Sequence, residues 1–121
     1  MLESALQSQV VGYLQTQRIT FFAVPNGLFI HGSTAAERAR RGAILKRRGA
    51  LQPGAPDLVL CLKGGRFGAI ELKVKDNDLT PAQEAMRTAI EKSGGMYAVC
   101  KSVEEVKGTL AAWLCGQRAA A

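Results

Sequence analysis

The fold is decided by the stretch at residues 56–75, PDLVLCLKGGRFGAIELKVK. Its first part, residues 57–62, is a short apolar run, which is typical of a strand. Its second part, residues 67–74, alternates apolar and polar positions, as a strand with one buried face does. The glycine pair at 64–65 separates the two runs and predicts a hairpin turn. We therefore expect two antiparallel strands in the middle of a sheet.

The second strand carries two charged residues that need an explanation. Glu71 and Lys73 lie two residues apart, so their side chains point to the same face of the strand. Either that face meets water, or the protein needs a negative and a positive group side by side. With the turn centred between residues 64 and 65, position 57 pairs close to position 72. Asp57 then lies near Glu71 and Lys73, and a modest register shift would put all three side chains on one face.

Outward from the hairpin, helix and strand signals alternate along the chain. Thr80 and Pro81 supply an N-cap and a first-turn proline, and Gly94 and Gly95 end the helix that begins there. The other expected elements are a helix at 2–17, a strand at 19–24, a helix at 34–48, a strand at 96–100 and a helix at 102–114. The order α-β-α-β-β-α-β-α indicates an α/β fold, in which helices flank a mixed sheet with a central hairpin.

The length and composition of the chain indicate one ordinary domain. A chain of 121 residues and 12.9 kDa is large enough for a single core, and we expect one domain at 1–116 followed by a frayed alanine tail at 117–121. No apolar run approaches the length of a membrane span and no leader opens the chain, so a cytoplasmic protein is the default expectation. Its three scattered cysteines, without a CxxC pattern, are expected to be reduced thiols.

The charge of the chain points to a polyanionic partner. The net charge is +6, and six of the sixteen Lys and Arg residues fall between positions 38 and 48, with no acidic residue among them. They are Arg38, Arg40, Arg41, Lys46, Arg47 and Arg48. Nucleic acid is the natural partner for such a cluster. The alternative is a helix face that is simply solvated.

The residues gathered by the hairpin can carry out phosphate chemistry. Two carboxylates a few ångströms apart repel each other, and a divalent cation removes that penalty. Mg²⁺ binds to one or two carboxylates and keeps its other positions for water and substrate phosphate. Lys73 could then stabilise the charge that develops at phosphorus. The alternatives are that Asp57 only ends a proline-rich turn and that Glu71 and Lys73 form an exposed ion pair of ~0.2–1 kcal/mol.

These motifs resemble a known family. The PD at 56–57 followed by ELK at 71–73 resembles the PD-(D/E)xK nuclease signature, and the run at 40–83, RRGAILKRRGALQPGAPDLVLCLKGGRFGAIELKVKDNDLTPAQ, resembles its VRR-NUC branch. The resemblance extends from ESALQ at 3–7 to VEEV at 103–106 and covers nearly all of the chain. It implies a restriction-endonuclease-like fold.

The resemblance also implies roles for individual residues. Asp57 and Glu71 would bind Mg²⁺, or Mn²⁺ in its place, together with the backbone carbonyl of Leu72. Lys73 would be the catalytic lysine, and Glu3 in the first helix would complete the metal shell. For Glu3 the alternative is a first-turn acid that interacts favourably with the helix dipole.

Gln83 has two possible roles. By resemblance it would orient the site, but it also occupies the third position of a Thr80 capping box, where Gln commonly satisfies backbone N–H groups. The two roles can coexist. Asn26 is a further possible DNA contact, although a turn residue is the simpler interpretation. His31, the only histidine, is expected to be a plain loop residue.

Small stand-alone members of this family look like phage or bacterial proteins that act as homodimers on branched DNA, notably four-way junctions. The resemblance therefore implies a metal-dependent endonuclease of branched DNA, and the residues expected to contact the DNA are Asn26, Arg38, Arg41, Lys46, Arg47 and Arg48. Two different functions stay open. One is a non-catalytic, structure-selective DNA-binding module, and the second is a nuclease that acts on flaps or on RNA.

Overall fold

The computed structural model describes residues 1–25, 30–49 and 52–116. It contains α1 (Glu3–Thr16), β1 (Thr20–Ala23), α2 (Ala35–Arg47), β2 (Leu58–Leu62), β3 (Arg66–Leu72), α3 (Pro81–Lys92), β4 (Met96–Cys100) and α4 (Val103–Leu114). The types and order of these elements confirm the α/β fold expected from the sequence. The tail predicted at 117–121 lies outside the described residues.

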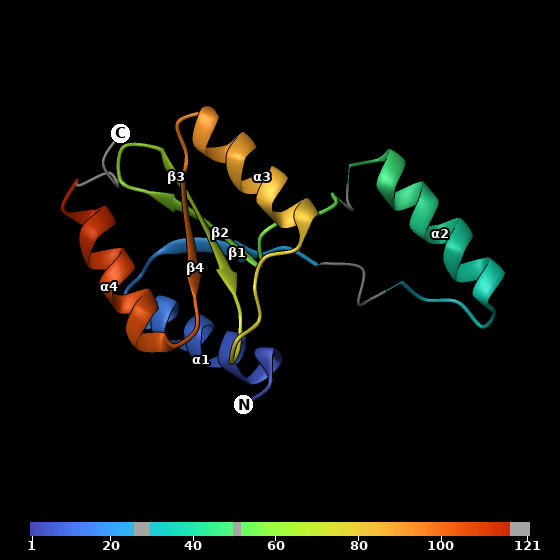
Figure 1. Cartoon of the computed structure of the whole chain (residues 1–121), viewed down its shortest axis with the longest axis horizontal. Coiled ribbons are helices and arrows are strands. Elements are labelled where there is room, and N and C mark those ends of the chain that lie inside the picture. Colours follow the sequence, from blue (N-terminus) through green and yellow to red (C-terminus); the bar gives the residue numbers. More distant parts are fainter. Residues whose placement is uncertain (26–29, 50–51, 117–121) are drawn as a thin grey trace.

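The four strands form one mixed sheet in the order β1-β2-β3-β4. β1, β2 and β3 are antiparallel neighbours, and β4 runs parallel to β3. The β2–β3 hairpin is therefore central, as predicted. Figure 1 shows the sheet between α1 and α4 on one side and α3 on the other, with α2 standing apart.

The core lies between the sheet and the layer formed by α1 and α4. Its fully buried side chains share a helical spacing on the two helices and every second position on the strands, and they include Leu6, Val10, Leu14, Leu58, Leu60, Ile70, Leu72, Val106 and Leu110. Each such side chain stabilises the fold by about 1.5–3 kcal/mol. Because Ile70 and Leu72 face this core, the residues between them face the opposite side, which α3 covers.

The hairpin register differs by one residue from the predicted one. Leu58 lies opposite Ile70, so Asp57 is level with Glu71 and not with position 72. The turn is a three-residue loop, because Leu62 pairs with Arg66. In this loop Gly64 and Gly65 have φ angles of 84° and 75°, which glycine adopts without steric cost. The corrected register places Asp57 and Glu71 on the same face without any further shift.

α2 is a well-capped helix with no buried side chain. At its start the Thr34 hydroxyl accepts a hydrogen bond from the Glu37 N–H at 3.0 Å. At its end Gly49 has a φ of 76°, the left-handed conformation that glycine commonly adopts just after the last turn of a helix.

Among the described residues, no helix is long and apolar enough to span a bilayer. The three cysteines are free thiols, as the sequence indicates.

Candidate active site

The charged face of β3 is buried. Glu71 is 2% exposed and Lys73 is 8% exposed, although both belong to residue types that are rarely buried. β3 lies between two other strands, and α3 covers this face of it. The interpretation in which the face meets water is therefore wrong, and so is an exposed ion pair. The remaining explanation is a site that uses opposite charges side by side.

Asp57 is fixed at the junction of three strands. Its carboxylate oxygen Oδ2 accepts a hydrogen bond from the Leu72 N–H at 2.8 Å, across the hairpin. Its backbone carbonyl accepts one from the Val24 N–H, just beyond β1, at 3.0 Å. The side chain is thus held against the end of β3, beside Glu71. Asp57 does more than end a turn, because its carboxylate links β2 to β3.

Gln83 caps α3 and contacts Glu71 at the same time. Its Oε1 accepts a hydrogen bond from the Thr80 N–H at 2.9 Å, and the Thr80 hydroxyl accepts one from the Gln83 N–H at 3.2 Å. Its Nε2 donates to Glu71 Oε2 at 3.2 Å. Because the capping bond occupies the carbonyl end of the amide, the NH₂ end must face Glu71. The capping bonds therefore coexist with the contact that an orienting residue would make.

Burial raises the pKa of Glu71 from 4.5 to about 8. Desolvation is the largest cause, since it disfavours the charged form, and the neighbouring Asp57 adds to it by repulsion and by a shared hydrogen bond. The positive charge of Lys73 opposes the shift, and the charge of Glu3 adds slightly to it. Below about pH 8, Glu71 therefore stays largely protonated beside Asp57 unless a further positive charge compensates it.

The oxygen atoms present suit a hard cation. When Glu71 is ionised, its buried Oε1 accepts no hydrogen bond from any donor in the described part of the chain, which costs about 1–3 kcal/mol unless something binds to it. Carboxylate and carbonyl oxygens are the ligands that Mg²⁺ prefers, and it completes its shell with water. Asp57, Glu71 and the carbonyl of Leu72 are thus a fitting donor set.

Glu3 is not part of a tight ligand cluster. In residues 1–25, 30–49 and 52–116, no group of three or more His, Cys, Asp or Glu side chains is arranged to hold a metal ion. Glu3 is exposed at the start of α1, and only its charge reaches Glu71. Among the described residues, this effect of its charge on Glu71 is the only support for the predicted role of Glu3 as a metal ligand.

The basic residues lie on α2 and, for Arg48, at its C-cap, and Figure 1 shows α2 standing apart from the sheet. Arg38 donates to the Gly32 carbonyl at 2.9 Å, and Arg41 donates to the His31 carbonyl at 2.8 Å and pairs with Glu37 at 2.8 Å. These two residues hold the preceding loop against the helix. A guanidinium has five N–H donors, so both retain donors for phosphate.

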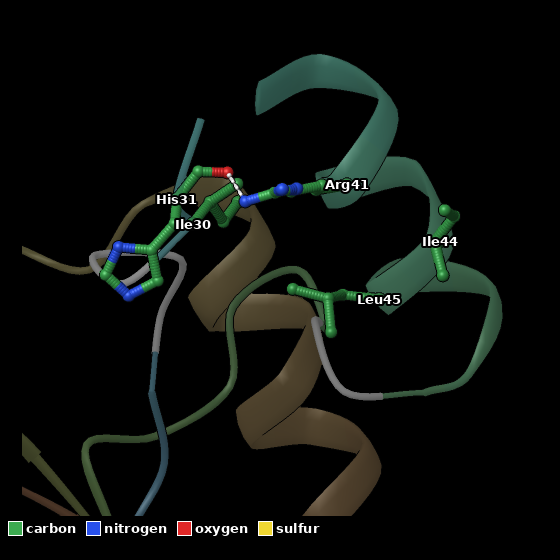
Figure 2. Close-up of a pocket in the computed structure, with 5 residues that line it drawn as sticks. All are labelled: Ile30, His31, Arg41, Ile44 and Leu45. Atoms are coloured by element: carbon green, nitrogen blue, oxygen red, sulfur yellow. Dashed lines mark hydrogen bonds between the residues drawn. The ribbon is translucent and has the colours of Figure 1, made fainter. Parts of the chain in front are cut away.

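Figure 2 shows Arg41 extended towards the His31 carbonyl, above a small apolar groove of about 250 Å³. The groove is lined by Ile30, His31, Arg41, Ile44 and Leu45. Lys46, Arg47 and Arg48 lie at the other end of the helix. Asn26 lies outside the described residues.

Two neighbours of the site were not identified from the sequence. Tyr97 in β4 is buried on the same face of the sheet, and the Arg87 guanidinium of α3 lies 5.4 Å from the centre of its ring. The alternating pattern of MYAVC at 96–100 indicates a strand, but only the strand order of the sheet brings Tyr97 beside Glu71.

Comparisons with known proteins found a family and a solved structure that this chain resembles. The family model of the VRR-NUC domain matches residues 6–104. A solved structure described as a VRR_NUC domain protein superposes with a TM-score of 0.65 at 26% sequence identity, covering 95% of this chain and 89% of the other. The curated proteins contain no match to this chain.

Proposed function

The chain belongs to the VRR-NUC family and carries a nuclease-type domain, and from this premise we propose that it is a Mg²⁺-dependent endonuclease of branched DNA, for which Mn²⁺ can substitute. The observation that supports the proposal is the buried pair Asp57 and Glu71 beside Lys73, with Glu71 Oε1 lacking a hydrogen-bond partner among the described residues. Such a pair is costly for a protein that does not use it.

Different residues of the chain would have separate roles in phosphodiester hydrolysis. Asp57 and Glu71 would hold the cation, which when bound neutralises the carboxylates and polarises the scissile phosphate. The Leu72 N–H and the Gln83 amide fix the orientation of these two carboxylates. Lys73 would lie near the attacking water and stabilise the negative charge that develops at phosphorus as the new O–P bond forms and the old one breaks. Burial strengthens this interaction because little water screens it.

The basic helix α2 would bind phosphates outside the cleavage site. Phosphate contacts carry no sequence information, so selectivity would follow the shape of the DNA. Resolving a four-way junction requires two symmetric nicks, and we propose a homodimer with two-fold symmetry to supply the two sites. The support for this step is the size of the domain and its family.

A labelled four-way junction, incubated with Mg²⁺ or with EDTA, tests the proposal. We expect cleavage only with Mg²⁺, and none by Asp57→Ala in either condition. DNA that is shifted in a gel but uncut with both additives would favour the non-catalytic binding module. Faster cleavage of a flap or of RNA, assayed in parallel, would change the assigned substrate. The mass of the DNA-bound protein, measured by light scattering, tests the dimer. The mass of a monomer would count heavily against it.

A further inference from the structure

The hydroxyl of Tyr97 is buried and has no hydrogen-bond partner among the residues that the structure describes. The residue is only 7% exposed. An unpaired buried hydroxyl costs about 1–3 kcal/mol, whereas Phe would fill the same space without that cost. Buried Tyr hydroxyls usually have a partner. Packing alone therefore does not explain why the hydroxyl is there.

Tyr97 and Glu71 are neighbours on one face of the sheet. Tyr97 pairs with Ala69 on β3, two residues before Glu71, so the two side chains are diagonal neighbours that point the same way. After burial, the charge of Glu71 is the largest cause of the raised pKa of Tyr97. Glu71 Oε1 also lacks a partner in the described part of the chain. Two unsatisfied polar atoms thus share one buried region.

One face of α3 covers both side chains. Gln83 donates to Glu71 Oε2, and Arg87, one turn later, stacks on the Tyr97 ring. The ring is therefore held between the sheet and the helix. Asp57 lies on the β2 side of Glu71, and Tyr97 lies on its β4 side.

We propose that Tyr97 is a positioning residue of the candidate metal site, and that its hydroxyl holds Glu71 Oε1 through one buried water. The water accepts the Tyr97 O–H and donates to Oε1, which satisfies both atoms, as buried waters commonly do. A carboxylate oxygen has two lone pairs, so Oε1 can bind this water and still face a cation. The proposal rests on the proposed function, because it assigns Glu71 to metal binding.

Tyr97→Phe removes the hydroxyl and keeps the ring against Arg87. Tyr13→Phe is a matched control, because Tyr13 also has a cation over its ring, Lys107 at 5.3 Å, but belongs to α1. We expect Tyr97→Phe to weaken Mg²⁺ and Mn²⁺ binding by about tenfold in calorimetric titrations without DNA, as loss of an outer-shell partner does. Tyr13→Phe should bind both ions like the wild type. An affinity of Tyr97→Phe within twofold of the wild type would overturn the proposal.

The same binding titrations separate this proposal from the proposed function. If the wild type binds neither Mg²⁺ nor Mn²⁺, as we expect of Asp57→Ala, the metal site itself is refuted. If wild type and Tyr97→Phe bind the ions equally well, only the role of Tyr97 is refuted. The unfolding midpoint in EDTA checks that Tyr97→Phe keeps its fold. At saturating Mg²⁺, junction cleavage by Tyr97→Phe should return to within about threefold of the wild-type rate, and a persistent larger loss would contradict a positioning role.

Discussion

Replacing Glu71 by Gln should remove a pH dependence of stability from the metal-free protein. Glu71 is 2% exposed and has a folded-state pKa of about 8, against an ordinary pKa of 4.5. Between these values the folded protein keeps a proton that the unfolded chain releases. The contribution of Glu71 to the free energy of unfolding therefore falls as the pH rises from about 4.5 to about 8 and is level outside that window.

The size of the effect follows from the two pKa values. They differ by three to four units, and each unit corresponds to ~1.4 kcal/mol, so the loss across the window is at most about 5 kcal/mol. That is a large share of the ~5–15 kcal/mol by which a domain is normally stable. For a domain of this length it corresponds to a decrease of the melting temperature on the order of 10–20 °C.

Urea unfolding in EDTA at pH 5, 6, 7 and 8 measures this dependence. The wild type should lose stability steadily across the series, while Glu71→Gln, which has no proton to release, should lose several kcal/mol less. Glu84→Gln, at an exposed position of α3, is the control and should follow the wild type. Mg²⁺ at pH 8 should restore the wild type and have no such effect on Glu71→Gln. Parallel curves for wild type and Glu71→Gln would refute the reasoning.

Three further predictions concern the proposed catalytic lysine Lys73, the basic helix α2 and the loop before β2. Lys73→Ala should bind the junction normally in a gel shift, while its rate of strand cleavage should fall by at least about a hundredfold. An unchanged cleavage rate would show that Lys73 is not the catalytic lysine. Arg47→Ala with Arg48→Ala should weaken binding and flatten its salt dependence by about one unit of slope per lost phosphate contact, and an unchanged slope would remove them from the interface. Gly54→Ala should lower the free energy of unfolding by at least ~2 kcal/mol more than Gly64→Ala does. Both glycines have a positive φ, but only at Gly54 would a new Cβ meet α3, 2.2 Å from a backbone carbonyl oxygen. Equal losses of stability in urea unfolding would contradict this prediction.

The elements of this fold were predictable because their signals are local. Thr34, Thr80 and Ser102 each cap a helix in the structure, as their spacing to the residue three positions later indicates. The hairpin register was not predictable to the residue. A Gly-Gly pair suits a two-residue turn as well as the three-residue loop that is present, and the two differ by one position in the pairing.

The site was predictable only as far as single strands define it. Alternation places Glu71 and Lys73 on one face, but it does not say whether that face is buried, because burial depends on α3 and on the neighbouring strands. Tyr97 belongs to the last strand, 26 positions after Glu71 in the sequence, and joins the site only through the parallel pairing of β4 with β3. Such contacts follow from tertiary structure and not from local pattern.

The start of α3 connects the stability of the fold to the geometry of the site. The same Gln83 amide that satisfies the Thr80 N–H also donates to Glu71, so the capping box fixes the direction from which Glu71 is held. Gly54 packs directly against this first turn, where no larger residue fits. A change that displaces the turn must therefore alter the orientation of Glu71 as well as the stability of the helix. Because the buried carboxylates destabilise the metal-free protein, cation binding and the packing of α3 should strengthen each other.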